Sequence, residues 1–388
     1  LAAFIAELTE GNPLFVSESL AWLHHENLLA FGDDGQWRWD LENIAQAEMP
    51  ASVVELFGAK IRKLPETTLT VLNFCACLGN LFDADDVALI EELPLYDLFE
   101  RLRPALSQGL LVEKKSDFQF VHDRVQEAVL RRLGPDQRRA IHWRIGWHLL
   151  GNQAVDETLL RVENLFVIAA HLGLGRPEKL EAAMLLRLAA VHFFAGNKAL
   201  DALATQAANE YFRAAQELLP PDAWERDYAL SFRIHQKLAK TELMCGRFEN
   251  SEAWVAELLA RAADDLDRAE ALAEQTTSLS SIGNFIKAIA TANRGLDFFG
   301  KAIPENADAA RDRMQALMGA IHAGDADVWQ TILTMPFTQD RRSKIELAFY
   351  SELIPDLYMS GRVPQLYLSA AQSTHHCLQG GMDESVIY

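Results

Sequence analysis

The sequence is poor in cysteine and has no long hydrophobic run. Its 388 residues include only four cysteines, Cys75, Cys77, Cys245 and Cys377. The nearest two lie in an apolar helical stretch, so we expect buried free thiols in a reducing cytoplasm, and neither disulfides nor a metal site. No segment approaches the roughly 18 apolar residues that a membrane-spanning helix needs, which predicts a cytoplasmic protein without a membrane partner.

Basic residues are in the minority. The chain has 36 lysines and arginines against 55 aspartates and glutamates, which gives a formal net charge of −19 at pH 7. Such a charge repels nucleic acid and anionic lipid, so extensive contact with either is not expected. One region has a local basic excess, formed by Arg101, Arg103, Lys114, Lys115, Arg124, Arg131, Arg132, Arg138 and Arg139.

Motifs of common enzymes are also missing. Ala195-Gly196-Asn197-Lys198 lacks the upstream glycine and the following Ser or Thr of a phosphate-binding loop, and no Gly-x-Ser-x-Gly, His-Glu-x-x-His or Cys-x-x-Cys occurs. The adjacent histidines at 24–25 and 375–376 would face different directions on a helix, so we expect exposed polar side chains there and no metal site. We therefore expect no catalysis by this chain alone.

What is present predicts a mainly helical protein of two or three domains. The first residues predict a helix over 1–8 and a second one that Pro13 opens and that ends near His25. Segments 27–31 and 36–39 predict a small β-hairpin. Trp37 and Trp39 would share one face of it, which we interpret as a packed aromatic face and not a ligand platform.

Residues 49–150 have the element order of a winged helix. We expect helices over 51–63, 65–78, 83–93 and 95–107, and then strands over 110–113 and 118–121. Such modules often bind DNA through the last helix before the wing, but the segment 95–100 offers few side chains suited to base edges. DNA binding by this module is therefore not favoured.

The second of these strands turns directly into a helix. We expect Asp123 to be the N-cap, with Gln126 returning a hydrogen bond as in a capping box. The helical spacing of Val121, Val125, Ala128, Val129 and Leu133 then predicts one buried face. A further helix is expected over 136–150.

Beyond residue 150 the sequence predicts helices of about 15 to 22 residues, separated by turns with small residues. The expected turns are Ala195-Gly196-Asn197, Cys245-Gly246-Arg247, Ile282-Gly283-Asn284, Ala323-Gly324-Asp325 and Ser360-Gly361-Arg362, with Pro220-Pro221 between hairpins. The intervals of about 37 to 50 residues are looser than the 34 of tetratricopeptide repeats. We expect a similar α-solenoid, in which stacked helical hairpins cover each other's apolar faces.

Two short motifs resemble those of the signal-transduction ATPases with numerous domains. Gly11-Asn12-Pro13-Leu14-Phe15 resembles the family's glycine-x-proline motif, and Val121-His122-Asp123 resembles its Met-His-Asp motif, with valine in place of methionine. In that family the proline packs on adenine and the histidine approaches the ADP β-phosphate. The resemblance implies that Gly11, Pro13 and His122 bind ADP or ATP in a full-length parent.

The wider match resembles the ATPase segment of bacterial multi-sensor histidine kinases and related serine/threonine kinases. It covers about the first 150 residues, and the helical remainder resembles the family more loosely. It implies a helical lid remnant with a β-hairpin over 1–48, a winged-helix domain with a linking helix over 49–150, and a tetratricopeptide-like domain over 151–388.

The resemblance also implies partners. Because the chain starts at Leu1 and has no phosphate-binding loop, we expect a fragment whose nucleotide-binding domain lies upstream and whose output domain, such as a kinase, lies downstream. The fragment itself would bind nucleotide weakly. A protein or small-molecule effector would bind the helical repeats and bias a nucleotide-gated switch.

Simpler interpretations stay open at this point. Pro13 could only start a helix, and His122 could only cap one. The chain could be an interaction scaffold without a nucleotide role, or part of a transcription regulator of the same ATPase class. An enzyme site hidden in the repeats has the least support, because no convergent acid–base or metal set occurs.

Overall fold

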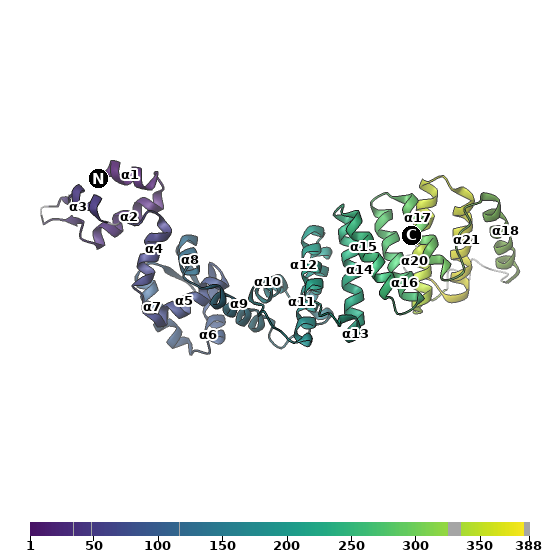
Figure 1. The fold of residues 1–388 in the computed structure, drawn as a ribbon, viewed down its shortest axis with the longest axis horizontal. Coiled ribbons are helices and arrows are strands. Elements are labelled where there is room, and N and C mark those ends of the chain that lie inside the picture. Colours follow the sequence, from purple (N-terminus) through teal and green to yellow (C-terminus); the bar gives the residue numbers. More distant parts are fainter. Residues whose placement is uncertain (34, 48, 116, 325–334, 384–388) are drawn as a thin grey trace. The chain divides into compact units, whose positions relative to one another are not determined.

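The computed structural model describes residues 1–33, 35–47, 49–115, 117–324 and 335–383. The chain divides into two compact units, Leu1–Gln153 with Phe166–Lys179 and Ala154–Leu165 with Leu180–Tyr388. Most described residues are helical, and the strands among them form two small sheets (Figure 1), which confirms the predicted mainly helical class. Within the described ranges, no helix is both long and apolar enough to cross a membrane.

The first unit begins with two short helices and a hairpin. The elements are α1 (Ala2–Thr9), α2 (Pro13–His25), β1 (Leu29–Phe31), β2 (Trp37–Trp39) and α3 (Leu41–Gln46). The two predicted helices and the hairpin are confirmed, with Leu29 opposite Trp39 and Phe31 opposite Trp37. The sequence did not predict α3, which Asp40 caps by accepting the N–H of Glu42 at 2.9 Å.

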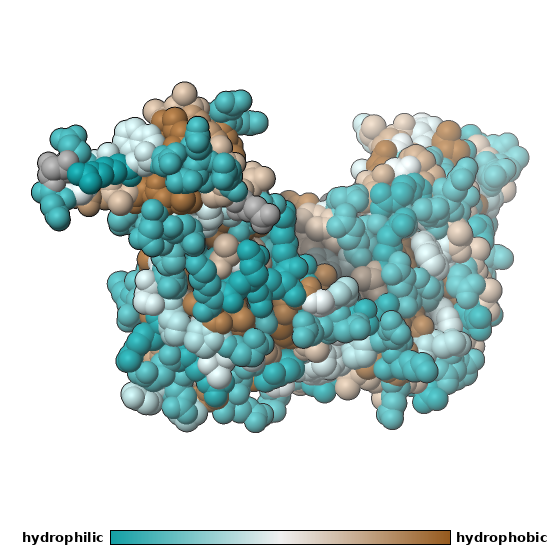
Figure 2. Space-filling view, turned by 60° about the vertical axis from the view of Figure 1, so that its left-hand side comes forward, coloured by the Kyte–Doolittle hydropathy of each residue, from teal (hydrophilic) through white to brown (hydrophobic). Residues whose placement is uncertain are grey.

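The aromatic residues of the hairpin remain about half exposed, with Phe31, Trp37 and Trp39 at 58%, 50% and 47%. The Trp37 ring packs edge-on against Phe31, with centroids 5.0 Å apart, and against His24 at 5.8 Å. Figure 2 shows apolar side chains, in brown, on the surface of this N-terminal part. Trp37 therefore packs against neighbouring rings, whereas the predicted packed face of Trp37 and Trp39 is left about half exposed.

A second sheet lies among the following helices. The elements are α4 (Val53–Arg62), α5 (Glu66–Leu78), β3 (Leu81–Asp83), α6 (Ala84–Ile90), α7 (Leu95–Ser107), β4 (Leu111–Lys114), β5 (Asp117–Phe120), α8 (Asp123–Leu130) and α9 (Pro135–Leu150). The strand order is β3-β5-β4, antiparallel throughout. The predicted strands β4 and β5 are confirmed, whereas β3, with only three residues, was not predicted.

The junction after β5 differs in detail from the prediction. His122, and not Asp123, is the N-cap of α8, because its Nδ1 accepts the N–H of Arg124 at 3.2 Å. Gln126 does not close a capping box, since its Nε2 donates to the carbonyl of Ala76 on α5 at 2.8 Å. Val121 is 46% exposed, while Val125 and Val129 are buried. The buried face of α8 is therefore the predicted one, except that its first residue is Val125 and not Val121.

Helix α10 (Leu165–Gly175) packs closely on α9 in the first unit. A Cβ atom on Gly175 would lie 2.2 Å from the backbone nitrogen of Trp143, and one on Gly146 would lie 2.8 Å from the Leu172 side chain. Only glycine permits such an approach, so these two positions fix the crossing of α9 and α10.

The described residues of the second unit form four helical hairpins. They are α11 (Ala182–Asp201) with α12 (Thr205–Glu217), α14 (Tyr228–Met244) with α15 (Phe248–Arg261), α16 (Asp265–Ser281) with α17 (Phe285–Asp297), and α20 (Arg341–Met359) with α21 (Val363–Gly380). Shorter or additional helices are η1 (Glu157–Arg161), α13 (Ala223–Arg226) and α18 (Ala307–Gly324). Figure 1 shows the hairpins side by side, which agrees with the predicted helical repeats.

Each of these hairpins is closed by one residue in the left-handed conformation. It is Gly246 (φ 77°), Gly283 (φ 78°) and Gly361 (φ 68°) in three hairpins and Leu203 (φ 59°) in the first. The turns predicted at the three glycines are confirmed. The turn predicted at residues 195–197 is wrong, because Gly196 lies inside α11. A Cβ there would lie 2.6 Å from the Phe212 ring, so packing explains that glycine.

Two other turn predictions are settled in part. Pro220-Pro221 does lie in the connection between α12 and α13, as predicted. Of Ala323-Gly324-Asp325, the first two residues end α18, and Asp325 lies outside the described residues.

The left-handed positions lead to a stability prediction. We expect Gly283→Ala to lower the free energy of unfolding by about 1 kcal/mol, because a Cβ is strained at positive φ, although the turn has space for it. Leu203 is 89% exposed, so Leu203→Gly should relieve the same strain and stabilise the unit by up to about 1 kcal/mol. Urea denaturation measures both changes. A less stable Leu203→Gly variant would contradict this account.

Candidate functional site

The predicted nucleotide-binding residues Gly11, Pro13 and His122 lie at or just before the starts of helices α2 and α8 in the first unit. The side chains of Pro13 and His122 are both exposed. Gly11 (φ 76°) makes the turn between α1 and α2. Pro13 is the first residue of α2, which Asn12 caps through hydrogen bonds of 3.1 and 3.2 Å from the N–H groups of Leu14 and Phe15. His122 caps α8 and is exposed as well. Neither ring is therefore sealed in the protein interior.

One hydrophobic core holds the two motifs in place. Leu14, next to Pro13, packs against the buried cluster that includes Phe57 of α4 and Val125 of α8. Helix α2 is also tied to α4 by an ion pair between Glu18 Oε2 and Lys60 Nζ at 2.6 Å. The core thus connects the start of α2 to the start of α8. The nucleotide roles of Gly11, Pro13 and His122 remain predictions.

The second unit contains a groove that the sequence did not reveal. It encloses about 580 Å³ between α12, the turn that follows α12, α14 and α15. Its walls carry aromatic, proline and charged side chains, among them Arg213, Pro221, Trp224, His235, Asn250 and Trp254. The volume lies in the usual range of ligand sites, and the walls are about equally polar and apolar.

Three rings form the aromatic wall of the groove. His235 lies between Trp224, with centroids 5.0 Å apart, and Trp254, at 5.3 Å. His235 Nδ1 lies 2.7 Å from the Ser231 carbonyl and must donate to it. Burial lowers the pKa of His235, so the ring is neutral at pH 7 and its Nε2 is an acceptor. The wall therefore combines two indole rings with a neutral imidazole.

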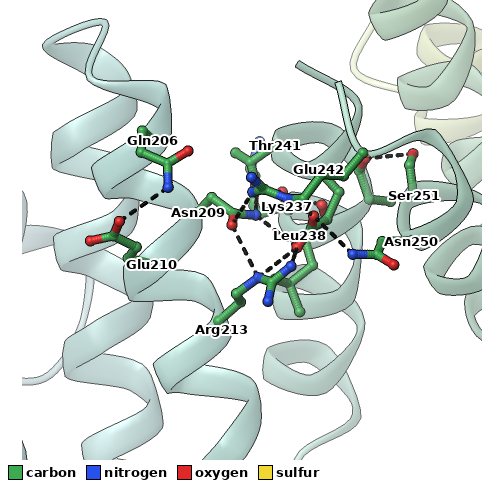
Figure 3. Close-up of polar contacts among 12 residues, drawn as sticks. Gln206, Asn209, Glu210, Arg213, Lys237, Leu238, Thr241, Glu242, Asn250 and Ser251 are labelled. Carbon is green, nitrogen blue, oxygen red and sulfur yellow. Dashed lines mark hydrogen bonds and ion pairs between the residues drawn. The ribbon is translucent and has the colours of Figure 1, made fainter. Parts of the chain in front are cut away.

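A buried carboxylate organises the polar part of the groove (Figure 3). Glu242 of α14 is fully buried, and its Oε1 lies 2.6 Å from an Nη of Arg213 on α12. Its Oε2 accepts from Arg247 Nε and from Asn250 Nδ2. Burial alone would raise the pKa of Glu242, but hydrogen bonds from Arg247, Asn209 and Arg213 outweigh it and lower the pKa. Glu242 is thus a carboxylate at pH 7.

Asn209 completes this network from α12. Its Nδ2 donates to Thr241 Oγ1 at 3.0 Å and to Glu242 Oε1 at 3.1 Å, and its Oδ1 accepts from Arg213 Nε at 3.1 Å and from Arg247 Nη2 at 2.5 Å. All its hydrogen-bonding groups are therefore used. The network joins two hairpins and holds Arg213 and Asn250 at the wall of the groove.

Two titratable groups beside the groove are already engaged by protein partners. His235 is committed to the backbone, and Glu242 is enclosed by donors. Among the described residues, no group of three or more His, Cys, Asp or Glu side chains is placed to hold a metal ion. Of the four free cysteines, Cys75, Cys77 and Cys377 are buried, as predicted, whereas Cys245 is partly exposed.

The two pairs of adjacent histidines differ in exposure, and the prediction that all of them are exposed is wrong for the second pair. His24 and His25 are exposed, as predicted, but His375 is only partly exposed, and His376 keeps only 13% of its side chain exposed and contacts Glu346 at 3.1 Å. Elsewhere, His142 Nδ1 of α9 lies 3.0 Å from His171 Nδ1 of α10. Burial and the neighbouring His171 lower the pKa of His142 to about 4. The pair is therefore neutral at pH 7 and joins two helices.

Comparisons with known proteins give limited similarity. No family model matches the chain. It is similar to the hybrid signal transduction histidine kinase G of Dictyostelium discoideum, with 25% identity over 325 residues. That match covers 68% of this chain and 10% of the kinase, so the chain spans about a tenth of its relative's length.

One solved structure is also similar to the chain. It is a signal transduction ATPase with numerous domains from Pyrococcus horikoshii that carries a tetratricopeptide repeat sensor. The comparison covers 97% of this chain and 56% of the other, at 15% identity and a TM-score of 0.29.

The buried carboxylate leads to a second prediction. We expect Glu242→Gln to lower the free energy of unfolding by about 2 kcal/mol, because it removes charge-assisted hydrogen bonds to two arginines. Glu249→Gln, an exposed change in the same hairpin, should stay within about 0.5 kcal/mol of the wild type. Because the folded-state pKa of Glu242 is lowered, its contribution is present above the ordinary value of 4.5 and is lost as the pH falls below it.

Urea denaturation at pH 7 and at a series of lower pH values measures the free energy of unfolding of both proteins. The difference in this free energy between wild type and Glu242→Gln should decrease as the pH falls below 4.5. A difference that stays constant down to pH 3 would show that the charge of Glu242 is not what stabilises the network.

Proposed function

We propose that this chain is a regulatory segment of a nucleotide-gated signal-transduction protein, with a first unit that reports nucleotide state and a helical-repeat unit that binds an effector. The observation that carries the proposal is the similarity over 325 residues to a hybrid signal transduction histidine kinase. The chain would be a sensor and not the catalyst, and the kinase or ATPase domains would belong to other parts of the parent protein.

The element order of residues 53–130 supports a winged helix in this proposal. Two helices, a strand, two helices and a two-stranded hairpin follow one another, and β3 pairs with the far strand of that hairpin. This is the order of a winged-helix module, with the β4–β5 hairpin as the wing. In the proposed organisation residues 1–48 are a lid remnant, 49–150 the winged-helix domain, and 151–388 the helical repeats.

The exposed positions of Pro13 and His122 support a nucleotide role. A proline ring at the start of α2 offers a flat apolar contact for a base, and an imidazole can donate to a phosphate oxygen. A nucleotide-binding domain elsewhere in the parent protein would supply the phosphate-binding loop. ADP or ATP would then lie between that domain and these residues, and this chain alone would bind it weakly.

The capping hydrogen bond of His122 allows a sharp test. In the parent protein we expect His122→Ala and His122→Asn both to raise the ADP dissociation rate, by about tenfold for the loss of one charge-assisted hydrogen bond. Asparagine retains a good N-cap but lacks the imidazole. Stopped-flow release of a fluorescent ADP analogue measures the rates.

Matched variants distinguish the two roles of His122. His25→Ala, which removes a histidine that is 64% exposed in the same unit, should leave the dissociation rate unchanged. If His122→Asn retains ADP like the wild type while His122→Ala does not, His122 acts only as a cap. If neither variant changes ADP release, the nucleotide role is wrong.

The groove of the second unit is the proposed effector site. Ala253 lines it on α15 and is exposed, so Ala253→Trp should fill the groove without removing a core contact. We expect this variant to abolish the effector response of the parent protein while ADP release stays unchanged. Ala256→Trp, another exposed alanine of α15, is the control and should respond normally.

A combination of these results would favour a different function. If the His122 variants release ADP normally while Ala253→Trp loses a bound partner, the chain is an interaction scaffold without a nucleotide role. Measuring ADP release and effector response on the same set of variants therefore separates the two functions.

A further inference from the structure

A second cavity of the helical-repeat unit is lined by two basic side chains and, among the described residues, by no acidic one. It measures about 410 Å³ and lies against α18 and α21, away from the groove that contains Trp224 and Trp254. Its apolar wall is formed by Ala316, Leu317, Ala320 and Leu368. Its polar lining consists of Lys301, Arg313, Gln372 and His375. Among the described residues that line it, none is acidic, in a chain whose net charge is −19.

Lys301 is held in place by a buried carboxylate. Its Nζ donates to Glu346 Oε1 at 2.5 Å and lies 3.2 Å from His376 Nδ1. Glu346 is 2% exposed and also accepts from Tyr350 at 3.3 Å. Burial would raise the pKa of Glu346, but the contacts from His376 and Lys301 outweigh it and lower the pKa. Glu346 is thus ionised, and Lys301 keeps 30% of its side chain exposed.

The loop that carries Lys301 is fixed by side chains of neighbouring helices. Asn293 exchanges two hydrogen bonds of 2.8 Å with the backbone of Ile303. Gln372 of α21 donates to the carbonyl of Lys301 at 3.2 Å, and Arg313 Nη1 of α18 donates to the carbonyl of Ala302 at 2.8 Å. These contacts place the Arg313 guanidinium beside the Lys301 loop. Both cations are therefore positioned before any ligand arrives, which lowers the cost of binding.

The lining of this cavity favours a ligand that is apolar at one end and negatively charged at the other. Apolar side chains on α18 and α21 favour a hydrocarbon chain or ring. The Arg313 guanidinium favours an anion, and the exposed part of the Lys301 ammonium, whose charge Glu346 partly offsets, can add a hydrogen bond to it. The volume lies in the usual range for small-molecule sites. We propose that this cavity binds a small amphipathic carboxylate, whose acid group contacts Lys301 and Arg313 and whose apolar body lies along Leu317 and Leu368.

Calorimetric titration of residues 1–388 with sodium octanoate at pH 7 tests the proposal. Octanoate should bind about tenfold or more tightly than octan-1-ol, because the alcohol lacks the charge. Arg313→Gln should weaken octanoate binding about tenfold and leave octanol binding unchanged. Arg313→Lys, which retains the positive charge, should recover part of the affinity.

Further variants separate binding from folding. Ala316→Phe should fill the cavity and abolish binding, whereas Arg311→Gln removes an exposed arginine of the same helix, paired with Asp308, and should bind octanoate like the wild type. Circular dichroism and thermal unfolding verify that each variant is folded. Octanol that binds as tightly as octanoate, an unchanged affinity of folded Arg313→Gln, or no octanoate binding by the wild type would each overturn the proposal.

Octanoate binding by this cavity does not depend on the nucleotide role proposed for the first unit. All residues involved belong to the second unit, and calorimetry measures a binding constant of residues 1–388. Failure of the His122 test would therefore not affect this proposal, and its own failure would leave the Trp224–Trp254 groove as the proposed effector site.

Discussion

Each helical hairpin of the second unit has apolar faces that its own two helices cannot cover. The neighbouring hairpins cover them, and one buried cluster runs through α14, α15, α16, α17, α20 and α21, including Ala239, Val255, Leu272, Ile289, Phe349 and Leu368. The packing is close enough that a Cβ on Gly295 would lie 2.0 Å from the Phe349 ring. Stacking is therefore a condition for each hairpin to be folded, as in other repeat proteins.

Two buried carboxylates add specificity to this apolar stacking. Glu242 of α14 receives Arg213 from α12 and Arg247 from the start of α15, and Glu346 of α20 receives Lys301 and His376 from other elements. A buried carboxylate without its cation is strongly destabilising, so each ion pair disfavours helix alignments that would separate its partners.

The same ion pairs place cations at cavity walls. Arg213 and Lys301 each hold a buried carboxylate and keep part of the side chain exposed, at 46% and 30%. Each also lines one of the two cavities described above. A residue that is positioned by the interior and still reaches solvent is well suited to bind a ligand, because its orientation is already fixed.

The first unit is built on a different constraint, since its short strands cannot form a stable sheet by themselves. Helices α4, α5, α7 and α8 enclose β3, β4 and β5, and Phe118 and Phe120 fill the space between them. That core fixes where α8 begins and thus where His122 lies. The exposed histidine is a consequence of the buried strand that precedes it.

The sequence by itself determined the elements that depend on local chemistry. Pro13 preceded by Asn12 marks the start of α2, the alternation at 118–121 predicts β5, and Gly246, Gly283 and Gly361 mark hairpin turns because each needs a positive φ. Errors arose where a residue serves distant packing. Gly196 looked like a turn but makes room for Phe212, and His376 looked exposed but holds Glu346.

Only the tertiary structure decided where the candidate sites lie. Pro221, Trp224, His235 and Trp254 are spread over more than thirty residues, and nothing in their spacing indicates that they line one groove. Glu242 and Glu346 resemble ordinary helix-surface glutamates until neighbouring helices bury them. A cavity and a buried ion pair depend on which helix faces meet, and that is set by the packing of whole hairpins and not by any local segment.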